Sequence, residues 1–125
     1  MTTDFLNSLS PAEILGLTIV GEARGELIQG QVAVGCVIRN RLLSGHKTYH
    51  DVCLAAKQFS CWNELDPNYP ILIELAEQLV NGQFLTDPYI KQCMFVARGI
   101  EDWSIIDNTA GATNYMTKDL FDSKT

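Results

Sequence analysis

The stretch SPAEILGLTIVGEARGE, residues 10–26, predicts a buried helix that carries a carboxylate in its last turn. Ser10, Pro11 and Glu13 form a capping-box signal, with the serine as N-cap and the proline at the first helical position. The apolar residues that follow recur at helical spacing, and Glu22 falls on their side of the helix. Two glycines then weaken the helix, so we expect it to end near Arg24.

Glu22 is the sharpest candidate for chemistry in this stretch. Burial disfavours the ionised form of a carboxyl group, so we expect its pKa to rise, as a general acid in glycoside cleavage requires. Glu26 would be its neighbour if helical winding continued for another turn. The alternative interpretation is structural: Glu22 pairs with Arg24, Arg39 or Arg41 and closes the helix end. The pattern alone leaves both interpretations open.

The rest of the chain predicts three more helices. Apolar periodicity and capping signals place them at residues 29–43, 70–80 and 88–98. Residues 46–68 show no sustained period and are expected to form a long structured loop, and residues 103–106 a short strand or turn. The predicted fold class is mainly α (α+β), with a small irregular β or loop part, in a single domain of 125 residues.

Composition excludes several classes of function. The net charge of −6 gives no basic surface for a nucleic acid, and 46% hydrophobic residues are enough for a folded core. No apolar run approaches the ~20 residues that a membrane-spanning helix needs. The first residues, MTTDFLNSLSP, do not resemble a secretory signal, so we expect synthesis in the cytoplasm. Neither a nucleic-acid partner nor membrane insertion is predicted.

The cysteines and histidines form no metal-binding pattern. Two of the four cysteines fall in apolar helical runs, where free cysteine is a common core residue. Cys53 and Cys61 fall in the long loop, and their pairing depends on the redox compartment. His46 and His50 lack a third ligand, so no metal and no cofactor is predicted. A nucleophilic pair of Cys61 with a histidine has no local support.

Two further segments have the composition of a sugar-binding surface. QFSCWNELDPN, residues 58–68, combines aromatic rings with amide and hydroxyl groups, and rings can stack on the C–H faces of sugars. The alternative is that Phe59 and Trp62 fill the core from a loop. DNTAGATNYM, residues 107–116, offers Thr113 and Tyr115, or is simply a turn followed by an edge strand.

Together these segments resemble a known family. The order GEARGE, GQVAVGCVIRNR, QFSCWN and GATNY is similar to that of the spore cortex-lytic, SleB-like cell-wall hydrolases, which cleave the glycan strands of peptidoglycan. The resemblance implies a compact, lysozyme-like helical fold related to lytic transglycosylases, with a motif-bearing core over about residues 10–116. Asn108 and Ala110 replace a proline and a glycine of the family's distal motif, which affects substrate placement more than chemistry.

The resemblance also implies which residues act. It gives the catalytic acid and base role to Glu22. The substrate-binding residues that it implies are Glu26, Gln58, Phe59, Ser60, Trp62, Thr113 and Tyr115.

The implied reaction is cleavage of the MurNAc–GlcNAc bond by a lytic transglycosylase, which needs no second carboxylate. The alternatives are a muramidase that uses Glu26 or Asp107 as its second carboxylate, and a non-catalytic glycan-binding module of the same fold. We expect a monomer that binds peptidoglycan glycan strands and acts on the bacterial cell wall, in the periplasm, as a phage lysis protein does.

Overall fold

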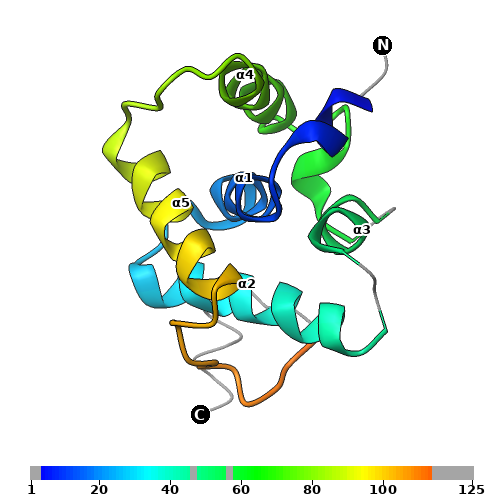
Figure 1. Cartoon of the computed structure of the whole chain (residues 1–125), viewed down its shortest axis with the longest axis vertical. Coiled ribbons are helices and arrows are strands. Elements are labelled where there is room, and N and C mark those ends of the chain that lie inside the picture. The colour runs from blue at the N-terminus through cyan, green and yellow to red at the C-terminus, as the bar shows by residue number, and fades with distance from the viewer. Residues whose placement is uncertain (1–3, 46–47, 56–57, 114–125) are drawn as a thin grey trace.

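Helix α1 runs through the middle of the protein and the other helices surround it (Figure 1). The computed structural model describes residues 4–45, 48–55 and 58–113. In chain order the elements are the 3-10 helix η1 (Asp4–Ser8), α1 (Pro11–Ala23), α2 (Ile28–Leu43), α3 (Tyr49–Leu54), the 3-10 helix η2 (Ser60–Trp62), α4 (Tyr69–Val80) and α5 (Pro88–Glu101). None of the helices in these ranges is long and apolar enough to cross a membrane.

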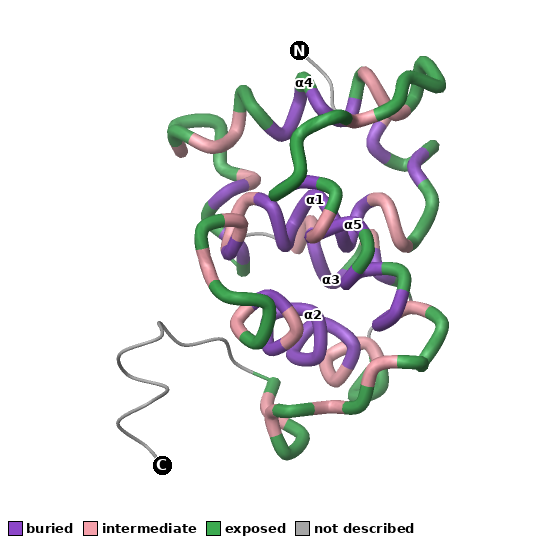
Figure 2. Tube along the Cα trace, turned by 90° about the vertical axis from the view of Figure 1, so that its left-hand side faces the viewer, coloured by how far each residue is buried: buried purple, intermediate pink, exposed green. Residues whose placement is uncertain are grey.

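The start of α1 confirms the predicted capping box. The Ser10 hydroxyl accepts a hydrogen bond from the Glu13 N–H (3.1 Å), and the Glu13 carboxylate accepts one from the Ser10 N–H (2.7 Å). Every residue from position 14 to position 20 is buried, so α1 is enclosed on all sides rather than amphipathic. Figure 2 shows buried stretches along α1, α2 and α5. The core therefore forms around α1, and the helix ends where the two glycines predicted.

The other three predicted helices are confirmed as α2, α4 and α5. The predicted long loop is wrong in part, because it contains α3 and η2. Thr48 begins α3 by accepting a hydrogen bond from the Asp51 N–H (3.0 Å), and Tyr49, Val52 and Cys53 are buried. A helix of six residues is too short to give a sustained period, which is why the sequence pattern missed it.

The residues after α5 form a turn, and the described part of the chain contains no strand. The predicted short strand or turn at residues 103–106 is therefore a turn, and the small β part is not found in the described ranges. A buried arginine, Arg39 of α2, holds this turn. It donates to the carbonyl oxygens of Ile100 (3.1 Å) and Ile105 (2.9 Å), and its guanidinium lies 4.0 Å from the ring centre of Trp103. Arg39 thus joins α2 to the end of α5.

The four cysteines are free, buried thiols in this structure. Cys53 and Cys61 therefore stabilise the core by packing, not by a disulfide. Burial also raises the pKa of the Cys53 thiol to about 12, so this thiol is neutral at physiological pH. No group of three potential metal ligands occurs among the described residues.

Candidate active site

The last turn of α1 places Glu22 directly against η2. Gly21 makes this possible, because a Cβ atom built on it would lie 2.5 Å from the Cβ of Cys61. With only a hydrogen at that position, the backbone of η2 approaches α1, and the Cys61 N–H donates to Glu22 Oε2 (3.4 Å). The first glycine of GEARGE therefore brings the QFSCW segment to the Glu22 carboxylate.

The thiol beside Glu22 is neutral. Burial raises the pKa of Cys61, and the neighbouring Glu22 carboxylate raises it further. A thiolate nucleophile at this position is therefore disfavoured. His50, the histidine in the described ranges that might have served as its base, instead contacts the carbonyl oxygen of Leu9 through Nε2 (2.9 Å). His50 therefore gives no geometric support to a cysteine–histidine pair.

Each of the three arginines that might have paired with Glu22 makes its own contacts elsewhere. Arg24 donates to the side-chain oxygen of Asn68 (3.2 Å). Arg39 donates to two carbonyl groups at the end of α5, and Arg41 donates to two loop residues. The ion-pair interpretation of Glu22 therefore does not describe the arrangement found. Glu22 is half-buried, next to a backbone N–H and an uncharged thiol.

Asn68 holds the chain on both sides of Glu22. Its side-chain nitrogen donates to the carbonyl oxygen of Gly21 (3.2 Å), and its side-chain oxygen accepts from Arg24 (3.2 Å). Because Asn68 precedes α4, these bonds fix the end of α1 against the start of α4. This role of Asn68 was not predicted from the sequence, since an asparagine before a helix is ordinarily a local cap.

Arg41 joins two segments that the sequence identified separately. It donates to the side-chain oxygen of Gln58 (3.0 Å) and to the carbonyl oxygen of Thr113, and its guanidinium lies 5.1 Å from the ring centre of Phe59. Gln58 and Thr113 are both exposed. The last turn of α2 thus brings these two predicted substrate-binding residues together. The sequence had offered Arg41 as a possible partner of Glu22.

The aromatic residues of QFSCW differ in their settings. Phe59 is only 3% exposed, which matches the alternative in which its ring fills the core. Trp62 is half-buried, and its indole N–H donates to the hydroxyl of Thr18 (3.0 Å), one turn before Glu22. Ser60 is exposed at the start of η2. Tyr115 lies outside the described residues.

Glu26 lies beyond the end of α1, so the helical spacing that would have made it a neighbour of Glu22 does not apply. Its N–H donates to the Ala23 carbonyl in a turn (2.9 Å). Its side chain lies over Gly30 in the first turn of α2, with Oε2 3.6 Å from the position of a Cβ atom there. A carboxylate near a helix N-terminus is stabilised by the helix dipole, which gives Glu26 a structural role.

Asp107 is the first residue of the distal motif, DNTAGATNYM at residues 107–116, and it organises the turn that follows it. It accepts hydrogen bonds from the Thr109 N–H (2.7 Å), the Thr109 hydroxyl (2.6 Å), the Gly111 N–H (2.9 Å) and the Asn40 side chain (3.0 Å). Partial burial raises the pKa of Asp107, but these hydrogen bonds outweigh it and lower the pKa to about 2. A carboxylate with such a low pKa is a weak base, so Asp107 is a poor partner for Glu22.

The low pKa of Asp107 gives a test by pH. Because its folded-state pKa lies below the unfolded value of about 3.9, the stabilisation is complete above about pH 5 and is lost as the pH falls toward 2. Asp107→Asn should therefore lose less stability than the wild type over that interval. Urea unfolding at pH 6 and pH 3 measures how far the free energy of unfolding of each protein falls between the two pH values. Equal losses in the two proteins would contradict this role.

Gly21→Ala is expected to lower the free energy of unfolding by about 1–3 kcal/mol, because the new methyl group overlaps the Cβ and Sγ atoms of Cys61. The helix propensity of alanine is about 1 kcal/mol more favourable than that of glycine. A loss of stability in Gly21→Ala would therefore have a steric cause. Gly25→Ala is the matched control, since nothing lies within 4 Å of a Cβ atom there. Denaturant unfolding of both variants measures the difference, and an equally stable Gly21→Ala protein would contradict the close packing.

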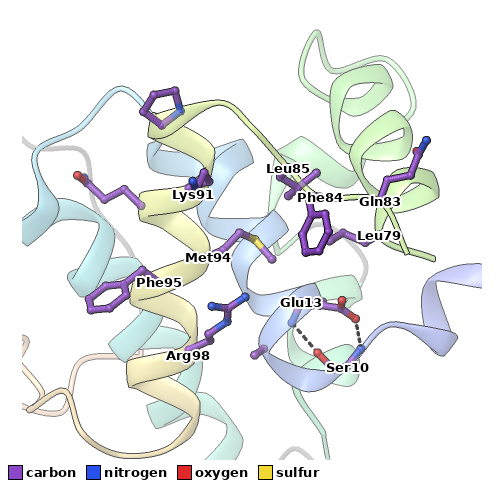
Figure 3. A pocket seen from close by; sticks show the side chains of 13 residues that line it. Ser10, Glu13, Leu79, Gln83, Phe84, Leu85, Lys91, Met94, Phe95 and Arg98 are labelled. Carbon is purple, nitrogen blue, oxygen red and sulfur yellow. Dashed lines mark hydrogen bonds between the residues drawn. The ribbon is translucent and has the colours of Figure 1, made fainter. Parts of the chain in front are cut away.

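Two cavities lie at opposite ends of α1. One of about 600 Å³ lies between the start of α1, the end of α4 and α5, and Lys91, Met94, Phe95 and Arg98 of α5 line one side of it (Figure 3). The other, of about 390 Å³, is lined by Arg24, Gly25, Asp87 and Tyr89. Only the second cavity adjoins the turn that follows Glu22.

Comparison with known proteins identifies the family. Residues 25–124, most of the chain, match the cell wall hydrolase family. The match includes Glu26, Arg41, the QFSCW segment and the distal motif, and it begins just after Glu22. Neither a curated protein nor a solved structure matches the chain significantly. On the extent of the family match, the chain belongs to the cell wall hydrolase family.

Proposed function

We propose that this protein cleaves the glycan strands of peptidoglycan at the bacterial cell wall, as a lytic transglycosylase with Glu22 as its catalytic acid and base. The observation that carries the proposal is the setting of the Glu22 carboxyl group. It is half-buried beside a neutral thiol, and Arg24, Arg39 and Arg41 are each engaged elsewhere. None of these three arginines is hydrogen-bonded to the Glu22 carboxyl group, and proton transfer by a positioned carboxyl group is the chemistry that glycoside cleavage requires.

The proposed reaction uses this one carboxyl group twice. Protonated Glu22 donates its proton to the glycosidic oxygen between N-acetylmuramic acid and N-acetylglucosamine, and the bond from that oxygen to the muramic C1 breaks. The resulting carboxylate then takes the proton of the muramic C6 hydroxyl, whose oxygen bonds to C1. The product is a 1,6-anhydro sugar, and Glu22 is protonated again. No water enters this reaction.

Gln58 and Thr113 are the proposed positioning residues for the sugar. Both are exposed and Arg41 holds both, so their orientation relative to α2 is restricted before substrate binds. Restricting the geometry of groups that meet a substrate lowers the entropic part of the activation barrier. Phe59 contributes as a buried support for Arg41 rather than as a stacking surface.

The competing mechanism is hydrolysis by two carboxylates. It requires a second carboxylate ~5 Å from the first for a retaining enzyme, or ~6.5–9.5 Å for an inverting one. Asp107 accepts three hydrogen bonds within its own loop and a fourth from Asn40 of α2. Glu26 lies over the start of α2, where it stabilises the helix terminus. These settings favour the mechanism with one carboxyl group.

Product analysis tests the proposal. Purified peptidoglycan sacculi are incubated with the full chain, loss of turbidity is followed, and the soluble fragments are analysed by mass spectrometry. We expect fragments that end in 1,6-anhydro-N-acetylmuramic acid, which borohydride does not reduce. Fragments with reducing ends only would replace the transglycosylase mechanism by hydrolysis. An absence of soluble fragments would contradict enzymatic cleavage altogether.

A further inference from the structure

The cavity of about 390 Å³ at the turn that follows α1 is lined by side chains of different chemistry. Arg24 and Gly25 come from the turn that follows α1, and Asp87 and Tyr89 come from the start of α5. The cavity therefore presents a cation, an anion and an aromatic ring within one open depression. Tyr89 is 68% exposed, so its ring is available to a ligand.

The two charged residues are fixed from outside the cavity. Arg24 is anchored through one nitrogen to Asn68 (3.2 Å), and a guanidinium has five N–H donors in all. Asp87 accepts hydrogen bonds from the N–H groups of Tyr89 (2.8 Å) and Ile90 (3.2 Å) through Oδ1. These contacts orient the side chains. As far as the described residues go, they leave the other Arg24 donors and the second Asp87 oxygen for a ligand.

The charges of Arg24 and Asp87 both act on the buried thiol of Cys93. Burial raises the pKa of Cys93 to about 11, while the charge of Arg24 lowers it and the charge of Asp87 raises it. Both charged residues therefore lie near Cys93 of α5, and both line the same cavity.

We propose that this cavity binds the peptide stem of peptidoglycan, an inference that rests on the proposed function. The stem is attached to the muramic acid sugar, the same sugar whose C1 reacts at Glu22. A subsite for the stem must therefore lie close to the catalytic carboxyl group, and this cavity is lined by Arg24 and Gly25 of the turn that directly follows the helix carrying Glu22. Stem peptides carry free carboxylates, and they also carry an ammonium group on their diamino acid.

The side chains match this chemistry group by group. The planar guanidinium of Arg24 can bind a carboxylate with two parallel hydrogen bonds. The free oxygen of Asp87 can accept a hydrogen bond from an ammonium group. Tyr89 offers a ring face for the apolar part of the peptide and a hydroxyl for its amides. The subsite would make peptide-bearing muramic acid the preferred substrate.

A comparison of two substrates tests the proposal. Glycan strands that carry stem peptides are compared with the same strands after an amidase has removed the peptides. We expect the wild type to cleave peptide-bearing strands with about tenfold higher kcat/KM, mainly through a lower KM. Arg24→Gln should remove most of that preference, and Asp87→Asn should reduce it about three- to fivefold.

The variants are chosen so that folding does not confuse the result. Asparagine caps a helix as well as aspartate does, so Asp87→Asn removes the charge and keeps the start of α5. Tyr89→Ala is matched by Phe95→Ala, because Phe95 lies on the same helix, is also 68% exposed and lines the remote cavity. We expect Tyr89→Ala to reduce the preference for peptide-bearing strands and Phe95→Ala to leave it unchanged.

A binding measurement makes the test independent of turnover. Calorimetric titration of Glu22→Gln with a disaccharide-tetrapeptide and with the bare disaccharide should show tighter binding of the former, lost in Arg24→Gln. If the wild type cleaves both strands equally well and both probes bind equally, the stem subsite is overturned while glycan cleavage stands. If the wild type cleaves neither kind of strand, the proposed function fails, and this inference with it.

Discussion

Glu22→Gln is expected to reduce the rate of glycan cleavage by about 10²–10⁴-fold, the usual contribution of a general acid and base. Glutamine has nearly the same shape as glutamate and can keep the contact with the Cys61 N–H through its side-chain oxygen. It cannot donate a proton to the glycosidic oxygen, nor take one from the C6 hydroxyl. Initial rates of turbidity loss on purified sacculi measure the effect.

Glu26→Gln is the matched control, because it removes a carboxylate from the same motif. It is expected to change the cleavage rate by no more than a few fold, since Glu26 stabilises the start of α2. Circular dichroism and thermal unfolding show whether both variants fold as the wild type does. An active Glu22→Gln protein would remove the proposed mechanism. A larger loss in Glu26→Gln would favour the two-carboxylate mechanism instead.

Arg39→Met is expected to lower the free energy of unfolding by about 2–4 kcal/mol. Methionine keeps the apolar stem of the side chain but leaves the carbonyl groups of Ile100 and Ile105 without their buried donor. It also removes the guanidinium stacked on Trp103, a residue held at a φ of 68° that non-glycine residues rarely adopt. Urea unfolding at neutral pH measures the loss.

Two further substitutions serve as comparisons for Arg39→Met. Arg39→Lys keeps the charge but cannot present a planar fork to both carbonyl groups, so its stability should lie between those of Arg39→Met and the wild type. Arg98→Met removes an exposed arginine from α5 and should change stability by no more than about 0.5 kcal/mol. An Arg39→Met protein as stable as Arg98→Met would contradict a role for Arg39 in holding the turn after α5.

The helices could be predicted because their signals are local. The capping box at Ser10 and Glu13 acts within one turn, and the residues that begin and end α4 and α5 act within a few positions. The helix α3 could not be predicted in this way. It contains six residues and is stabilised by burial against the core, which a periodic pattern of that length does not show.

The candidate site was predictable only in part. Glu22 was identified from its position on an apolar side of α1, and its place in the last turn is confirmed. The interpretation of Phe59 as a sugar-stacking ring competed with another, in which its ring fills the core from a loop. Its 3% exposure favours the competing one. Whether an aromatic side chain faces solvent depends on what packs over it, and for Phe59 this includes Arg41 from another helix.

The sequence by itself determined where the main helices begin and end and which carboxylate stands at the end of the central one. The tertiary structure alone decided what surrounds that carboxylate. Asn68 and Arg41 reach across the fold to residues more than 15 positions away in the chain, and Cys61 meets Gly21 only because α1 and η2 pack together. Such contacts depend on how whole helices pack against one another. The local sequence around each residue therefore does not predict them.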